Sequence, residues 1–179
     1  LADHDDTLPE HAFYEVVKAV NEHPDCEVLY SDEDKLDMDG KALFDPHFKP
    51  DFNPDLLTSV NYICHLFVVK KSLLDQVGGF RKEFDGAQDY DFIFRCTEKA
   101  AKIVHIPKVL YHWRCHQGST ASNPESKMYA FEAGSRAVMA HYERVGIPAE
   151  SVEKGVDYGI YHTHFKIQGE PLVSVIIPN

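Results

Sequence analysis

Residues 86–114 read GAQDYDFIFRCTEKAAKIVHIPKVLYHWR, and this stretch decides the fold class. In its first half, apolar side chains recur with the spacing of a helix, which predicts a helix over residues 89–102. Its second half is apolar and β-branched, which predicts strands over residues 103–106 and 109–113, separated by Pro107. A helix followed directly by strands is typical of α/β proteins.

The same alternation of helices and strands continues on both sides of this stretch. Further helices are predicted over residues 9–23, 54–59, 72–77 and 124–146, and further strands over residues 27–31, 62–69 and 158–165. Thr7 and Glu10 have the spacing of a capping box at the first helix. The pattern favours a mixed α/β sheet with helices on its faces.

Composition excludes several classes of protein. The chain has 179 residues, 44% of them hydrophobic, which is enough for a packed core and excludes a disordered chain. Its net charge of −11 argues against a nucleic-acid binder, because phosphate contacts require clustered Lys and Arg. The four cysteines form no C-x-x-C pair, and no apolar run reaches the roughly 18–20 residues of a membrane span. We therefore expect a reduced, cytoplasmic protein.

The first candidate site is the acidic cluster Asp3-His4-Asp5-Asp6. Carboxylates this close repel one another, and a cation between them relieves that repulsion. Their hard oxygen ligands suit Mg²⁺ or Mn²⁺, which also bind substrate phosphates. The alternative, equally compatible with these residues alone, is a solvated loop whose acids favour the N-terminus of the next helix.

The second candidate site is GAQDYD, residues 86–91, at the start of a predicted helix. A helix N-terminus keeps Asp89 ionised, and partial burial that raises its pKa would suit it to act as a general base. Asp is also a preferred helix cap, so a plain capping role remains the alternative.

Two loops complete the set of candidates. In residues 112–120, HWRCHQGST, Arg114 is suited to a phosphate and His116 to a metal ion. The alternative is a surface loop with one core tryptophan, Trp113. Residues 48–55, FKPDFNPD, combine aromatic and polar groups that would line a sugar site, or else form a Pro-rich connection.

Together and in this order, these segments resemble glycosyltransferase family 2, in particular its bacterial cell-surface polysaccharide members. The resemblance covers residues 1–121. It is carried by Asp3-His4-Asp5 as a D-x-D motif, YSDEDK at 30–35, FKPDF at 48–52 followed by Asn61-Tyr62, GGF at 78–80, GAQDYD at 86–91 and YHWRCH at 111–116. The family usually has Glu-Asp where this chain has Gln88-Asp89.

The resemblance implies a mechanism and a set of site residues. Asp89 would be the catalytic base that deprotonates an acceptor hydroxyl, with inversion at the anomeric carbon. Asp3, Asp5 and His116 would hold Mn²⁺ or Mg²⁺ against the leaving diphosphate. The residues expected to bind substrate are Asp6, Asn61, Gln88, Asp91, Trp113 and Arg114.

The resemblance also implies a domain organisation. The nucleotide-binding half of the GT-A fold would precede Leu1, so we expect residues 1–121 to form the metal- and acceptor-binding part of a partial GT-A domain. Residues 122–168 would be a helical extension and linker, and residues 169–179 the first strand of a following domain. The apolar run at residues 172–177 would be able to dock at a vacated sheet position. We expect such a piece to be weakly active or inactive by itself.

The partners follow from the same resemblance. They are a nucleotide-sugar donor and a glycan or lipid-linked acceptor, and no nucleic acid. Peripheral association of the parent protein with the inner face of the membrane is left open.

Two other functions remain as alternatives. Asp3-x-Asp5-x-Thr7 matches the D-x-D-x-T pattern of haloacid-dehalogenase-like phosphatases, with Asp3 as nucleophile. That family also needs a downstream Lys with an acidic pair, and no acidic pair follows Lys108 or Lys127 in a suitable context. The second alternative is a non-catalytic carbohydrate-binding module.

Overall fold

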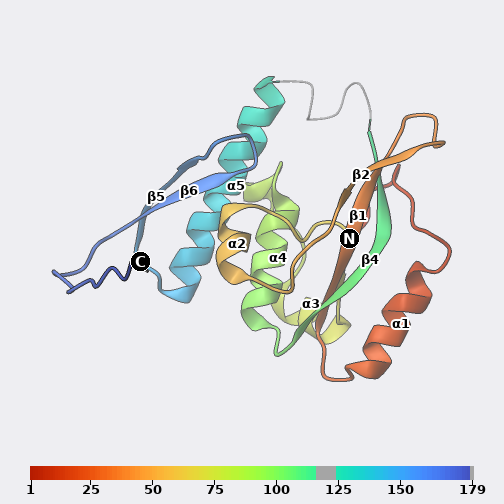
Figure 1. The fold of residues 1–179 in the computed structure, drawn as a ribbon, viewed down its shortest axis with the longest axis horizontal. Coiled ribbons are helices and arrows are strands. Elements are labelled where there is room, and N and C mark those ends of the chain that lie inside the picture. The colour runs from red at the N-terminus through yellow and green to blue at the C-terminus, as the bar shows by residue number, and fades with distance from the viewer. Residues whose placement is uncertain (116–123, 178–179) are drawn as a thin grey trace.

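The computed structural model describes residues 1–115 and 124–177, without the side chains of residues 124–127 (Figure 1). None of the helices in the described part of the chain is both long and apolar enough to cross a membrane.

The centre of the fold is a mixed four-stranded sheet built around β1 (Val28–Leu36). Strand β4 (Ile103–Arg114) runs parallel to β1 along its whole length on one edge. The other edge is shared by two antiparallel strands, β3 (Phe67–Val69) beside the first half of β1 and β2 (Leu43–His47) beside the second. The predicted mixed α/β sheet is therefore confirmed.

Helices cover both faces of this sheet (Figure 1). Helix α1 (Ala12–Glu22) packs against β4 on one face. The opposite face carries α2 (Pro54–Ser59), α3 (Lys71–Val77), the 3₁₀ turn η1 (Lys82–Phe84), α4 (Gln88–Lys99) and α5 (Pro124–Val145). The flanking helices expected from the sequence are thus present on both sides.

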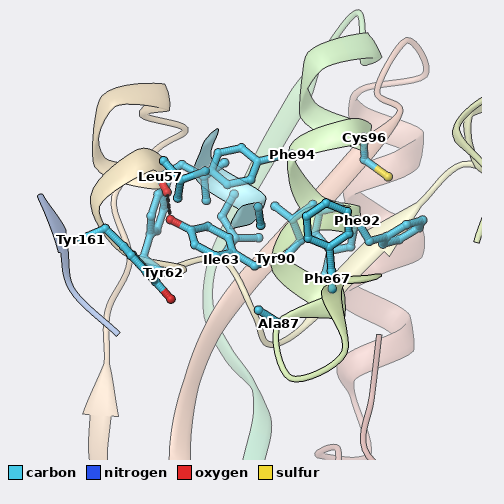
Figure 2. Close-up of a cluster of buried hydrophobic side chains, with 14 of the residues drawn as sticks. Leu57, Tyr62, Ile63, Phe67, Ala87, Tyr90, Phe92, Phe94, Cys96 and Tyr161 are labelled. Atoms are coloured by element: carbon cyan, nitrogen blue, oxygen red, sulfur yellow. Dashed lines mark hydrogen bonds between the residues drawn. The ribbon is translucent and has the colours of Figure 1, made fainter. Parts of the chain in front are cut away.

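The larger core lies between the sheet and the second helical layer (Figure 2). It is rich in aromatic rings: Tyr90 stacks on Phe94 with centroids 4.6 Å apart, and Phe67 meets Phe92 edge-on at 6.1 Å. The buried hydroxyl of Tyr90 donates a hydrogen bond to the carbonyl of Leu57, which satisfies its polar end and ties α4 to α2.

A separate two-stranded hairpin, β5 (Ala149–Lys154) and β6 (Tyr161–Phe165), follows α5 and packs against it. The contact is close because Gly134 has no side chain: a Cβ there would lie 1.8 Å from the hydroxyl of Tyr161. Strand β5 was not predicted, since its sequence AESVEK is mostly polar.

The structure corrects the prediction of two strands around Pro107, because β4 is continuous. The register jumps at this point: Ser31 pairs with Ile106, while the next residue, Asp32, pairs with Val109. The bulge places Pro107 and Lys108 outside the ladder, so the missing N–H of proline costs no hydrogen bond.

Other boundaries also differ from the prediction. The capping box is absent: α1 begins later than expected and lacks a side-chain cap at its N-terminus, while Thr7 instead pairs with His112 of β4. Of residues 62–69, only the last three form a strand, and the exposed strand β2 was missed.

The C-terminal run at residues 172–177 is extended and belongs to neither sheet. Its five apolar side chains are 75–97% exposed, so in this chain the run does not occupy a position in the sheet. Its assignment to a following domain stays a prediction.

Candidate functional site

A pocket of about 640 Å³ opens where the parallel strands β1 and β4 end. Ligands of α/β sheets commonly bind outside the carboxyl ends of the strands. Lys35 of β1 and its ladder partner Trp113 of β4 form one side of this pocket, and Asn61 and Asp89 form the floor. The facing wall comes from α5 and from the turn between β5 and β6.

Asp89 lies in the first turn of α4 and is half-buried. The Nδ2 of Asn61 donates a hydrogen bond to Asp89 Oδ2 at 2.9 Å, which orients the carboxylate. The other amide atom, Asn61 Oδ1, is buried and has no hydrogen-bond partner among the described residues. The neighbouring Gln88 accepts a local hydrogen bond from the backbone N–H of Gly86 at 2.8 Å. The structure therefore brings Asn61 and Asp89 together, as a site requires.

A buried lysine holds the loop that carries Asn61. The side chain of Lys49 is fully buried, and its ammonium group donates to the carbonyls of Ile63, at 3.0 Å, and His65. It also pairs with Glu33 at 3.3 Å, and the same Glu33 oxygen accepts the backbone N–H of His65. Burial lowers the pKa of Lys49, although the Glu33 carboxylate opposes this shift. This ion pair fixes the loop two residues beyond Asn61.

The acidic N-terminal segment is fastened to the end of β4, beside the pocket. Asp6 accepts the backbone N–H of Arg114 at 2.7 Å and the hydroxyl of Tyr111. The guanidinium of Arg114 donates to the backbone carbonyl of Asp5 at 2.7 Å. Trp113, the residue directly before Arg114, lines the pocket, so the acidic segment is attached next to a residue of the pocket. These contacts make Asp6 an anchor of the segment.

The candidate metal ligands are only partly described. Asp3 is exposed and the side chain of Asp5 is 31% exposed, whereas His116 lies outside the described residues. Within residues 1–115 and 124–177 there is no group of three or more His, Cys, Asp or Glu side chains arranged to hold a metal ion. Mg²⁺, however, commonly uses one or two protein carboxylates and completes its shell with water and substrate phosphates. The assignment of Asp3 and Asp5 as metal ligands stays a prediction.

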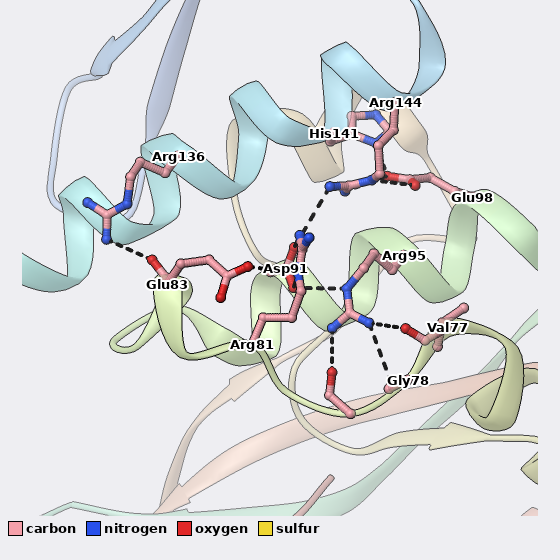
Figure 3. Close-up of polar contacts among 11 residues, drawn as sticks. Val77, Gly78, Arg81, Glu83, Asp91, Arg95, Glu98, Arg136, His141 and Arg144 are labelled. Atoms are coloured by element: carbon pink, nitrogen blue, oxygen red, sulfur yellow. Dashed lines mark hydrogen bonds and ion pairs between the residues drawn. The ribbon is translucent and has the colours of Figure 1, made fainter.

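Asp91, expected to bind substrate, has the contacts of a structural residue (Figure 3). Its carboxylate is fully buried and is bound by the guanidiniums of Arg81 and Arg95, the latter at 2.9 Å. Arg95 also donates to the carbonyls of Val77 and Gly79. The network fixes the start of α4 against the end of α3, and so holds Asp89 in place.

Sequence reasoning missed two groups near this pocket. Lys49 and Glu33 belong to segments that were interpreted as a sugar-binding loop and as a family motif, and no local pattern signals that a lysine will be buried. In the β5–β6 turn, Tyr158 and Gly159 were predicted to begin a strand, within the region 122–168 that was assigned as a helical extension and linker. The glycine in this segment was a signal that a turn lies there. No signal in the sequence indicated that the turn lies beside Asp89, because that position depends on the packing of α5.

Comparison with known proteins gives two sequence relatives. No protein-family model matches the chain. It is 46% identical over 180 residues to the uncharacterized protein y4gI of Sinorhizobium fredii, and 41% identical over 174 residues to the O-antigen biosynthesis protein RfbC of Myxococcus xanthus. These alignments cover 99% and 97% of this chain but only 20% and 13% of the relatives. The chain thus spans a fifth or less of the curated relatives it matches.

Among solved structures, the chain is similar to the crystal structure of S. aureus TarS 1-349. The TM-score is 0.47 with 17% sequence identity, and the superposition covers 79% of this chain and 44% of that one.

Proposed function

We propose that the protein is a glycosyltransferase of polysaccharide biosynthesis, which transfers a sugar from a nucleotide-diphosphate sugar to a hydroxyl acceptor. One support is the 41% identity, across nearly the whole chain, to a relative named for O-antigen biosynthesis. The other is the family 2 resemblance of residues 1–121, whose acceptor-site motif lines the pocket and whose acidic motif is fastened to Arg114, next to the pocket residue Trp113.

The observation that carries this proposal is the Asn61–Asp89 pair at the floor of the pocket. A general base must lie within hydrogen-bonding distance of the acceptor hydroxyl, so its position is the first criterion for assigning it and its pKa the second. Asp89 is half-buried, is held by one amide hydrogen bond and lines an open pocket. In our mechanism its carboxylate takes the proton of the acceptor hydroxyl as that oxygen attacks the anomeric carbon, and the configuration inverts.

The leaving diphosphate would lie on the opposite side, near the acidic segment. Asp3 and Asp5, with His116, would hold Mn²⁺ or Mg²⁺, which supplies neutralising charge for a diphosphate. Arg114 would add a second positive charge there. Its hydrogen bond to the carbonyl of Asp5 couples its position to that of the acidic segment. Trp113 would separate the two ends of the substrate.

Turnover of nucleotide sugars by the full-length protein tests the proposal. A panel of nucleotide-diphosphate sugars is incubated with Mn²⁺ and a crude polysaccharide acceptor, and release of the nucleoside diphosphate is measured. Asp89→Asn should reduce transfer about 10²–10⁴-fold, the usual effect of removing a general base, while donor affinity is kept. The matched control is Asp85→Asn, at an exposed aspartate that does not line the pocket.

Normal turnover by Asp89→Asn would refute the assignment of the base. A second variant tests the proposed metal site. Asp5→Ala should weaken binding of both Mn²⁺ and the nucleotide sugar in calorimetric titrations. Glu10→Ala should not, because the exposed Glu10 also loses a carboxylate but lies outside the acidic segment. Equal metal affinity in the two variants would remove Asp5 from the proposed metal site.

A further inference from the structure

The turn between β5 and β6 forms a wall of the Asp89 pocket, although it lies beyond the part of the chain that resembles the family. Three consecutive residues of this turn, Asp157, Tyr158 and Gly159, line the pocket together with Trp113 and Asp89. We propose that this turn is the acceptor-binding wall and that the acceptor it takes is a saccharide. This inference rests on the proposed glycosyl transfer and names the acceptor class and the residues that select it.

The wall has a fixed position relative to Asp89. Within the turn, the N–H of Gly155 donates to the carbonyl of Ile160 at 2.8 Å. Ile160 also forms a β-bridge with Val60, the residue directly before Asn61. The turn and the side chain that orients Asp89 are therefore joined through adjacent backbone positions. An acceptor held by the turn would be held at a defined place relative to the base.

The base of the turn is anchored in the aromatic core. The ring of Tyr161 stacks on Phe131 with centroids 5.2 Å apart, and lies 5.7 Å from the ring of Tyr90. Burial raises the pKa of Tyr161 to about 12, so its hydroxyl stays protonated at neutral pH. Figure 2 shows Tyr161 reaching the cluster that contains Tyr90, the neighbour of Asp89. The hairpin is thus part of the scaffold of the pocket.

The chemistry of the lining favours a neutral polyol. Its described side chains include two carboxylates, Asp89 and Asp157, and one ammonium, Lys35, which is already paired with Asp45. Such a balance disfavours a phosphate-bearing acceptor. Carboxylates accept hydrogen bonds from hydroxyl groups, and aromatic rings cover the C–H face of a sugar. Rings and carboxylates together match the alternating polar and apolar surfaces of a saccharide.

Tyr158 is the ring placed to make this contact. It is 37% exposed, and the ammonium of Lys154 lies 3.6 Å from its centroid, which restrains the orientation of the ring. The Oδ1 of Asp157 accepts the backbone N–H of Tyr158 at 2.7 Å, and in the proposed complex its Oδ2 accepts from a sugar hydroxyl. Both groups belong to one turn.

Binding of simple sugars tests the inference without any catalytic turnover. Trp113 is the single tryptophan of the chain and lines the pocket, so its fluorescence reports occupancy. The probes are methyl glycosides of glucose, galactose, mannose, rhamnose and N-acetylglucosamine, with glycerol phosphate as the charged comparison. We expect at least one glycoside to change the fluorescence saturably, and to bind more tightly than glycerol phosphate.

Variants of the turn identify the wall. Tyr158→Leu should weaken binding of that glycoside about three- to tenfold, and Asp157→Asn should weaken it by a smaller factor. Val156→Ala is the matched control, since Val156 lies in the same turn, is 97% exposed and does not line the pocket. Circular dichroism confirms that each variant is folded.

The inference is overturned if no glycoside changes the fluorescence, if glycerol phosphate binds at least as tightly, or if both turn variants bind like the control. Its failure is distinguishable from failure of the proposed function. Hydrolysis of the nucleotide sugar in the absence of acceptor should depend on Asp5 and not on Tyr158. If the wild-type full-length protein releases no nucleoside diphosphate with any donor, the transferase proposal fails whatever the glycoside titrations show.

Discussion

Replacing Asp91 with asparagine should strongly destabilise the fold, because it removes the charge at the centre of a buried network (Figure 3). The Asp91 side chain is 0% exposed and the side chain of Arg95 only 8% exposed, so water screens this pair very little. Arg81 binds the same carboxylate from the turn after α3 but is 34% exposed. In the variant, both guanidiniums lose their anion, and that of Arg95 stays buried.

The expected magnitude follows from the burial of the pair. Removing one partner of a buried ion pair typically costs about 3–5 kcal/mol, because the remaining charge is left uncompensated. For a chain of this size, each kcal/mol shifts the melting temperature by about 2–4 °C, so the midpoint should fall by roughly 6–20 °C. Urea titration followed by far-ultraviolet circular dichroism measures the free energy of unfolding directly.

The control for this experiment is Asp85→Asn, a change of the same chemistry at an exposed site. It should alter the free energy of unfolding by less than about 0.5 kcal/mol. A loss below about 1 kcal/mol in Asp91→Asn would refute the reasoning, since it would mean that the network is not energetically coupled. Full stability together with weakened glycoside binding would instead restore Asp91 to the substrate site predicted from its motif.

Three further predictions concern the scaffold around the pocket. Gly134→Ala should destabilise the protein by about 1–3 kcal/mol in urea titrations, because the new methyl group would overlap the hydroxyl of Tyr161. Unchanged stability would mean that the hairpin is not tightly packed. Lys49→Met should speed hydrogen exchange in residues 61–66, measured by mass spectrometry, because it removes the ion pair with Glu33 that holds this loop. Exchange in β4 should stay slow. Protection of residues 61–66 equal to that of the wild type would contradict the role given to Lys49. Burial acts to raise the pKa of Glu98, but hydrogen bonds from a histidine and an arginine of α5 outweigh it, so the pKa lies below its ordinary value of 4.5. The resulting stabilisation is present above pH 4.5 and is lost as the pH falls through the depressed pKa of Glu98. Glu98→Gln should therefore flatten the acid side of the curve of unfolding free energy against pH. An unchanged curve would contradict this role of Glu98.

Local chemistry made several elements predictable. Helix α2 has the bounds that its Asn-Pro start predicts, and the side chain of Asn53 accepts the N–H of Leu56 as a cap should. Gly78 closes α3 with φ of 77°, a conformation that residues other than glycine rarely adopt. These signals are local because a cap or a turn is decided by the conformation of a few consecutive residues.

Pairing decided what local chemistry left open. Pro107 was expected to divide two strands, yet a bulge carries it through one continuous strand beside β1. Strand β2 is exposed along its length, so no hydrophobic alternation marked it, and it exists because the edge of β1 offers unpaired backbone groups. Such strands depend on a partner that is distant in the sequence.

The sequence by itself determined the α/β class, most of the helices and the choice of Asp89 and Asn61 as candidate site residues. Only the tertiary structure decided that the two are hydrogen-bonded and that Asp91, two residues from Asp89, is buried against two arginines. It alone brought the β5–β6 turn to the pocket. The physical reason is that propensity acts over a few residues, whereas burial and charge pairing are set by packing between segments far apart in the chain.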